Sequence, residues 1–224
     1  MKGFFVTGTG TNEGKTFVTR GLARHLRRRG VDVAALKPLE TGVDPTPVDA
    51  QALAHACGRP ELADLPGFYR ACAPLSPFSA TMRGEPPVPP TSSLITSLDQ
   101  VVCDIMLVEG AGGVLVPLDA KRTIADLIAA LRIPSLLVAR NGLGVISHVC
   151  CAHEALAHRQ LSIAAVVLTE HGPADTSQDD NLQALRALLP TPVVRFPSAP
   201  NDDDALAIAA TELASLLVRN MYLQ

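Results

Sequence analysis

The chain has 224 residues, of which 47% are hydrophobic and 18% are charged, and its formal net charge is −3. This composition is sufficient for a large buried core, and the slightly negative charge argues against a nucleic-acid-binding surface. No apolar stretch reaches the roughly 18 residues that a membrane-spanning helix needs, and the N-terminus lacks the pattern of a signal peptide. The five cysteines show no C-x-x-C spacing, which fits reduced thiols. We therefore expect a cytoplasmic protein with neither a membrane nor a nucleic-acid partner.

Short apolar runs alternate with segments of helical periodicity along the whole chain. The apolar runs predict strands at 3–7, 31–36, 104–109, 135–139, 162–168 and 193–196. Helices are predicted from 17 to Gly30, around 49, at 92–99, 123–131, 145–159 and 178–189, and in a last segment that follows the acidic run 201–204 and ends near 218. The acidic run is expected to cap that last helix. The alternation predicts an α/β fold with one doubly wound, mainly parallel sheet and helices on both faces, in a single domain spanning 1–224.

A glycine-rich loop follows the first predicted strand, with the sequence Gly-Thr-Gly-Thr-Asn-Glu-Gly-Lys-Thr at 8–16. A strand, a loop ending in Gly-Lys-Thr and a helix together indicate a phosphate-binding loop. Its backbone N–H groups surround a polyphosphate, Lys15 neutralises phosphate oxygens, and the Thr16 hydroxyl can bind Mg²⁺. The spacing is a variant of the usual one, because Thr9 stands five residues before Gly14 and glycines flank it on both sides.

Two further polar groups follow predicted central strands. Lys37 comes directly after the second strand, and Glu109 ends the third and is followed by Gly-Ala-Gly-Gly. Ligands of open parallel sheets bind at the carboxyl ends of the strands, so both side chains are expected beside the phosphate loop, with Glu109 able to reach Mg²⁺. Asp49 lies in the first turn of a short predicted helix, where the sequence leaves a helix cap and a metal ligand equally open.

The predicted helix near 145 begins with glycines and with Ser147, so its exposed N–H groups form a candidate site for a carboxylate. The histidines and cysteines that follow on this helix lack the i, i+4 histidine pair of a metal site and are expected to be packing residues.

Taken together, four segments resemble the dethiobiotin synthetase family: the loop at 8–16, Lys-Pro-Leu-Glu-Thr-Gly at 37–42, Glu-Gly-Ala-Gly-Gly at 109–113 and Leu-Gly-Val-Ile-Ser-His at 143–148. The resemblance covers nearly the whole chain and implies the fold of a P-loop NTPase. It also implies a ligase that needs Mg²⁺ and uses ATP and CO₂ to convert 7,8-diaminopelargonate (7,8-diaminononanoate) into dethiobiotin, ADP and phosphate. In that reaction a carbamate forms, ATP converts it into a carbamic–phosphoric anhydride, and the second amine closes the ring.

The resemblance also implies roles for individual residues and an assembly. The catalytic residues are Lys15, Lys37 and Thr11; the nucleotide-binding residues are Asn12, Glu13, Gly14, Lys15, Thr16, Phe17, Thr169 and Pro197; the substrate-binding residues are Thr11, Lys37, Thr41, Gly110, Ala111, Gly112, Gly144, Val145, Ile146 and Ser147; and the magnesium ligands are Thr16, Asp49 and Glu109. The metal interpretation of Asp49 is thereby favoured over the cap. A homodimer is implied, with the site at the interface and residues 144–147 binding the substrate's tail carboxylate from the partner subunit.

One departure from the family pattern bears on nucleobase selectivity. Thr169 stands where the family has an adenine-reading asparagine, and a hydroxyl discriminates between bases less well than an amide, which suggests relaxed nucleobase selectivity.

The alternative function is a regulatory or partitioning ATPase that works as a nucleotide-dependent dimer switch. Such proteins carry a lysine early in the loop, where this chain has Thr9 and Gly10.

Overall fold

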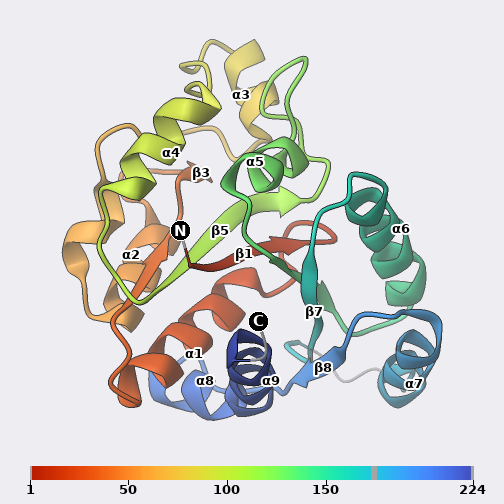
Figure 1. Cartoon of the computed structure of the whole chain (residues 1–224). Helices are drawn as coiled ribbons and strands as arrows, with labels where there is room; N and C mark the ends of the chain where they lie inside the picture. Colours follow the sequence, from red (N-terminus) through yellow and green to blue (C-terminus); the bar gives the residue numbers. More distant parts are fainter. Residues whose placement is uncertain (1, 173–175, 223–224) are drawn as a thin grey trace.

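The computed structural model describes residues 2–172 and 176–222, which form a central sheet with helices on both faces (Figure 1). The sheet has six strands in the order β2-β5-β1-β6-β7-β8, and each pair of neighbours is parallel. The strands are β1 (Gly3–Gly8), β2 (Val33–Leu36), β5 (Ile105–Gly113), β6 (Ser135–Arg140), β7 (Ile163–Thr169) and β8 (Val193–Phe196). This confirms the predicted doubly wound parallel sheet. Among the described residues, no helix has both the length and the hydrophobicity that a membrane crossing requires.

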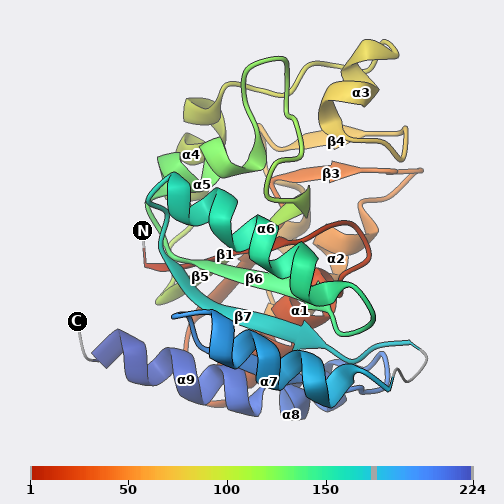
Figure 2. The same ribbon diagram turned by 90° about the vertical axis from the view of Figure 1, so that its right-hand side faces the viewer.

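The helices form one layer on each side of the sheet (Figure 2). One layer contains α1, α8 and α9, and the other contains α5 and α6. The helices are α1 (Lys15–Arg28), α2 (Val48–Cys57), α3 (Pro77–Met82), α4 (Thr91–Asp99), α5 (Ile124–Leu131), α6 (Val145–His158), α7 (Gln178–Leu188), α8 (Asp203–Ala209) and α9 (Thr211–Tyr222). The predicted end of the first helix is confirmed, because Gly30 follows α1 with a φ of +79°.

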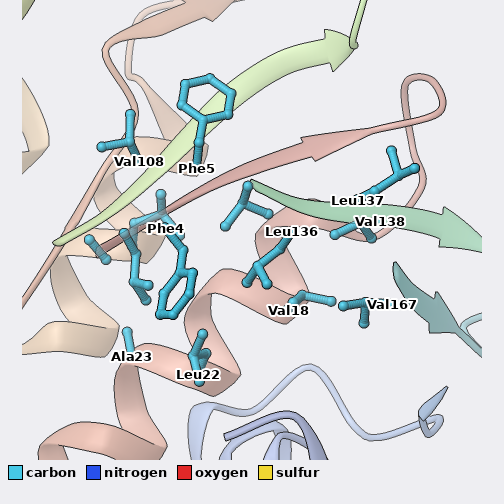
Figure 3. Packing of buried hydrophobic residues seen from close by; sticks show 14 of the residues in the cluster. Phe4, Phe5, Val18, Leu22, Ala23, Val108, Leu136, Leu137, Val138 and Val167 are labelled. Atoms are coloured by element: carbon cyan, nitrogen blue, oxygen red, sulfur yellow. The ribbon is translucent and has the colours of Figure 1, made fainter. Parts of the chain in front are cut away.

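The core is built around β1, whose six residues are all buried because both faces of the sheet are covered. Phe4 points toward Leu22 and Ala23 on α1, whereas Phe5 points to the opposite face of the sheet (Figure 3). Successive strand residues alternate between faces, so two adjacent phenylalanines fill both halves of the core. This packing fixes the position at which β1 ends and the phosphate loop begins.

Five parts of the fold differ from the prediction. A two-stranded parallel sheet, β3 (Leu39–Thr41) with β4 (Tyr69–Ala71), was not predicted, and neither were the 3₁₀ helix at Pro60–Asp64 and α3. The strand predicted to end at Glu109 continues to Gly113, where it pairs with Gly8. The prediction of one last helix is wrong, because this segment forms two separate helices, α8 and α9. At the junction between the two helices, the Thr211 hydroxyl donates a hydrogen bond to the Ile208 carbonyl at 2.7 Å.

The acidic run before α8 has two roles. Asp202 caps the helix as predicted, since its side chain accepts hydrogen bonds from two backbone N–H groups in the first turn. Asp204 lies 2.8 Å from both Arg24 and Arg28 on α1, and Asp203 lies 2.7 Å from Arg20. These ion pairs connect α8 with the helix that begins at the phosphate loop.

Candidate active site

A cavity of about 800 Å³ opens at the carboxyl ends of the central strands. Its walls come from the loop after β1, the segment after β2, the glycine-rich end of β5 and the segment after β7, which is where ligands of open α/β sheets bind. The lining residues are Thr11, Asn12, Glu13, Gly14, Lys15, Thr16, Phe17, Lys37, Glu40, Thr41, Asp49, Pro74, Leu75, Ser76, Pro77, Ala111, Gly112, Val116 and His171. Most of the predicted site residues therefore face one cavity.

The phosphate loop presents the start of α1 to this cavity. Gly14 precedes the helix with a φ of +90°, and among the described residues no side chain caps the N-terminus and no acid lies in its first turn. The first N–H groups of α1 are therefore available to an anion. Lys15 folds back over the loop, and its ammonium group donates to the Gly10 carbonyl at 2.6 Å. Burial lowers the pKa of Lys15, and the nearby carboxylate of Glu109 opposes that shift.

Glu109 is the centre of the polar network below the cavity. Its carboxylate is 0% exposed and accepts hydrogen bonds at 2.8 Å from Thr16 and from Lys37, and the Thr19 hydroxyl also lies 2.8 Å away. Lys37 additionally forms an ion pair with Asp49. Burial alone would lower the pKa of Lys37, but the carboxylates of Glu109 and Asp49 together hold it above its usual value. Lys37 is therefore a buried cation with two anionic partners.

The three predicted magnesium ligands, Thr16, Asp49 and Glu109, are brought together around Lys37. One hydroxyl and two carboxylates supply only oxygen donors, and Mg²⁺ usually takes one or two carboxylates together with phosphate oxygens and water. The residues present therefore fit Mg²⁺. No group of three or more histidines, cysteines or acids that suits a metal occurs in the described part of the chain.

Glu40 was missed by the sequence analysis, although it lines the cavity and is 6% exposed. Its carboxylate accepts hydrogen bonds from the backbone N–H groups of Asp49 at 2.9 Å and of Ala50 at 3.0 Å. Pro47 at the start of α2 provides no side-chain cap, so Glu40 takes that role from another strand. Burial raises the pKa of Glu40, against the effect of these two hydrogen bonds. Glu40 thus fixes the turn that carries Asp49.

The predicted substrate-binding residues at the end of β5, at 110–112, divide into two groups. Ala111 and Gly112 line the cavity with Thr11 and Thr41. Gly110 does not line it, because it packs on the opposite side of the strand; a Cβ there would lie 2.9 Å from the ring of Phe5. The close packing against Phe5 explains why a glycine stands at position 110.

An apolar wall of the cavity was also missed. Pro74, Leu75 and Pro77 lie in the segment that leads from β4 into α3, and Val116 follows β5. Ser76 belongs to the same wall and caps α3 by accepting a hydrogen bond from the Ser79 N–H at 3.1 Å. No local signal in the sequence placed this segment at the site.

The structure places the predicted nucleotide-binding residues in two locations. The loop residues and Phe17 line the cavity, whereas Thr169 and Pro197 do not. Thr169 is 2% exposed, and its hydroxyl donates to the Glu13 carbonyl at 2.8 Å, so it supports the loop from behind. His171, which was not predicted, lines the cavity in its place. A direct contact of Thr169 or Pro197 with a nucleobase stays a prediction.

Residues 144–147 lie at the start of α6 and outside the described cavity. Gly144 has a φ of +90°, and no described side chain caps this helix. Gly144 and Ser147 are exposed, Ile146 is half-buried and Val145 is buried. The neighbouring Arg140, for which the sequence analysis had no role, donates its backbone N–H to the Glu13 carboxylate at 2.6 Å. The predicted contact of this segment with a substrate in a partner subunit is untested.

The fold and the phosphate loop define a P-loop nucleotide-binding protein. The cell division ATPase MinD of Pyrococcus furiosus superposes with a TM-score of 0.62 over 98% of this chain and 99% of that chain, at 19% sequence identity. The signal recognition particle receptor FtsY of Elizabethkingia anophelis superposes with a TM-score of 0.52 over 93% of this chain and 64% of that chain, at 14% identity. These likenesses concern the fold alone.

Sequence relatives define the family. A family model described as an AAA domain matches residues 2–203. The ATP-dependent dethiobiotin synthetase BioD of Anaeromyxobacter dehalogenans is 42% identical over 178 residues, which cover 78% of this chain and 79% of that protein. The enzyme of the same name from Mycobacterium avium is 42% identical over 193 residues, covering 83% and 85%. The chain belongs to the dethiobiotin synthetase family and is therefore a ligase.

Proposed function

We propose that the protein converts 7,8-diaminopelargonate, CO₂ and ATP into dethiobiotin, ADP and phosphate, as a step of biotin biosynthesis. The observation that carries the proposal is the placement of two buried lysines, Lys15 and Lys37, on one cavity, with Asp49 beside Lys37 on that cavity and the buried Glu109 beneath it. Joining an anionic carbamate to an anionic phosphoryl group requires fixed cations and N–H donors. Nucleotide binding alone does not require the second lysine.

The proposed chemistry has three steps. An amine of the substrate adds to CO₂ and loses a proton, which gives a carbamate. A carbamate oxygen attacks the γ-phosphorus of ATP, ADP leaves, and the product is a carbamic–phosphoric anhydride. The second amine then attacks the carbamate carbon, phosphate leaves, and the five-membered ring closes. This last step is intramolecular, so proximity supplies much of its rate.

Residue roles follow from positions in the cavity. Lys15 and the N–H groups at the start of α1 bind the β- and γ-phosphates. Lys37 stabilises the negative charge that develops between carbamate and γ-phosphate. Thr11 and Thr41 line the same cavity and orient the carbamate by hydrogen bonds. Ala111 and Gly112 let the substrate approach the backbone of β5 closely.

Thr16, Asp49 and Glu109 would hold Mg²⁺ beside the phosphates. The ion, when bound, supplies positive charge to the phosphate oxygens as ADP leaves. The protein's own contribution is to hold both carboxylates in place, through the ion pairs that Lys37 forms with each and through the Glu40-capped turn of α2 that carries Asp49.

We further propose that the chain acts as one domain and as a homodimer in the cytoplasm. One sheet delivers cavity residues from Thr11 to His171, which supports the single domain. The uncapped start of α6, with Gly144 and Ser147 exposed, suits the substrate's tail carboxylate and lies outside the chain's own cavity. In the proposed dimer, each subunit offers this helix start to the cavity of its partner.

The test is direct synthesis. The purified protein is incubated with diaminopelargonate, bicarbonate and MgATP, and dethiobiotin is sought by mass spectrometry, with ADP measured in the same sample. Equal amounts of dethiobiotin and diamine-dependent ADP support the proposal. ATP hydrolysis that ignores the diamine would contradict it and favour the nucleotide-dependent switch.

A further inference from the structure

The cavity has two ends that lie on opposite sides of β1. In the sheet order β2-β5-β1-β6-β7-β8, β2 and β7 are each two places from β1, and Lys37 follows β2 while His171 follows β7. Both side chains line the cavity. On the proposed function, on which this inference rests, the γ-phosphate lies at the Lys37 end. The nucleoside of ATP must then extend toward His171.

Two aromatic rings stand at that end. The rings of His171 and Phe17 meet edge to face, with centroids 5.9 Å apart and an angle of 89° between their planes. Gly14 permits this arrangement, because a Cβ on it would lie 3.1 Å from the His171 ring. Thr169, the predicted base-reading residue, is buried behind the loop with its hydroxyl bound to Glu13. At this end of the cavity, a base would therefore contact the aromatic pair of Phe17 and His171.

Both ring nitrogens of His171 already have protein partners. Nε2 lies 3.0 Å from the Asn12 carbonyl, and Nδ1 lies 3.0 Å from the Thr169 hydroxyl. These contacts hold the ring rigidly beside the loop and leave no ring nitrogen to read the hydrogen-bonding edge of a base. The face of the ring can still stack. Stacking on an aromatic side chain accepts every base, because each base has a π-face.

We propose that His171, with Phe17, forms the nucleobase site and holds the base by stacking rather than by reading its edge. The ligand class is any nucleoside triphosphate, purine or pyrimidine. His171 is thus a binding residue that supplies affinity for a base without preference among bases. The relaxed selectivity predicted for Thr169 thus has its physical source two residues further along the chain.

The experiment compares ligands with and without a base. Dissociation constants for MgATP, MgGTP, MgCTP and magnesium tripolyphosphate are measured by calorimetry on the wild-type protein, His171→Ala, His171→Phe and the control His158→Ala. His158 is an exposed histidine at the end of α6. The readout is the ratio of the tripolyphosphate to the nucleotide dissociation constant, which cancels any general weakening of the phosphate loop.

We expect His171→Ala to lower this ratio on the order of tenfold for all three nucleotides. His171→Phe keeps an aromatic face but loses both hydrogen bonds, so its ratio should stay within about threefold of the wild type. His158→Ala should match the wild type. An unchanged ratio in His171→Ala would overturn the proposal, because His171 would then serve only the loop. So would a ratio in His171→Phe as low as that of the alanine variant, or a loss confined to one nucleotide.

The proposed function and the stacking site can be contradicted independently of each other. A wild-type protein that binds the nucleotides as expected but forms no dethiobiotin from diaminopelargonate, bicarbonate and MgATP would contradict the synthetase proposal, while the ratios would support the stacking site. Dethiobiotin formation by the wild-type protein together with an unchanged ratio in His171→Ala would support the synthetase proposal and contradict the stacking site.

Discussion

Replacing Lys37 by methionine tests the charge arrangement at the centre of the site. Lys37 is 6% exposed, and its ammonium group lies 2.8 Å from a carboxylate of Glu109 that is 0% exposed. Removing one partner of a buried ion pair typically costs about 3–5 kcal/mol, because the other charge stays buried without compensation. Hydroxyl groups of Thr16 and Thr19 remain within 2.8 Å of Glu109 and offset part of that loss. We therefore expect the free energy of unfolding to fall by about 3 kcal/mol.

The assay is urea unfolding followed by far-ultraviolet circular dichroism, since the chain has no tryptophan to serve as a fluorescent probe. A companion variant combines Lys37→Met with Glu109→Gln and so removes both charges. We expect the double variant to regain at least half of the lost stability, because its interior then holds no unpaired ion. The exposed Lys121→Met serves as the matched control and should change stability by less than about 0.5 kcal/mol.

The single variant Lys37→Met also tests the proposed catalytic role of Lys37. Loss of Lys37 should lower kcat by about 10²–10³, the usual effect of removing one group that stabilises developing charge. The dissociation constant for MgATP should stay within about threefold, because Lys15 and the start of α1 remain. An unfolding free energy equal to that of the wild type would refute the charge argument, and an unchanged kcat would remove Lys37 from the chemistry.

Three further changes test other parts of the site and fold. Glu40→Ala should cost about 1–2 kcal/mol by uncapping α2, and it should raise the Mg²⁺ concentration for half-maximal activity because the turn holding Asp49 is released; an unchanged Mg²⁺ titration would contradict this. Gly110→Ala should cost about 1–3 kcal/mol in urea unfolding, because its Cβ would meet the Phe5 ring at 2.9 Å, and Phe5→Leu should relieve part of that cost. Hydrogen bonds from the Lys121 and Arg122 backbone and from the Arg122 side chain lower the pKa of Asp119 to about 2 from 3.8. The stability that Asp119 contributes is therefore present above about pH 4 and lost as the pH falls toward 2, so unfolding of Asp119→Asn should depend less on pH in that window.

The sheet and the phosphate loop were predictable because their signals are local. Each central strand is a short apolar run bounded by polar residues, and the loop carries its glycines and Lys15 in consecutive positions. The small sheet of β3 and β4 was missed because strands of three residues have too little length to show a period. The division between α8 and α9 was missed because a single residue, Ala210, separates the two helices.

The site was predictable only where residues follow strand ends. Lys37 directly follows β2, and Glu109 lies near the carboxyl end of the adjacent strand β5, so the topology of the parallel sheet brings them together. Glu40 and His171 acquire their positions from partners distant in sequence, namely α2 for Glu40 and the phosphate loop for His171. Thr169 shows the limit of reasoning from strand ends, because the residue is placed correctly along the chain but faces the loop. The orientation of a side chain at a strand end depends on packing that the sequence does not display.

The lysines of the site are stable because neither is left without an acceptor. Lys15 donates to the Gly10 carbonyl, and Lys37 binds Asp49 and Glu109, so each cation is compensated by protein oxygens although the two are 7% and 6% exposed. An uncompensated ammonium group at that depth would lose its proton instead. Anionic substrates must therefore exchange with these oxygens rather than bind bare charges. The cost of charge burial is met during folding, and the proposed reaction needs only a change of partners at Lys15 and Lys37.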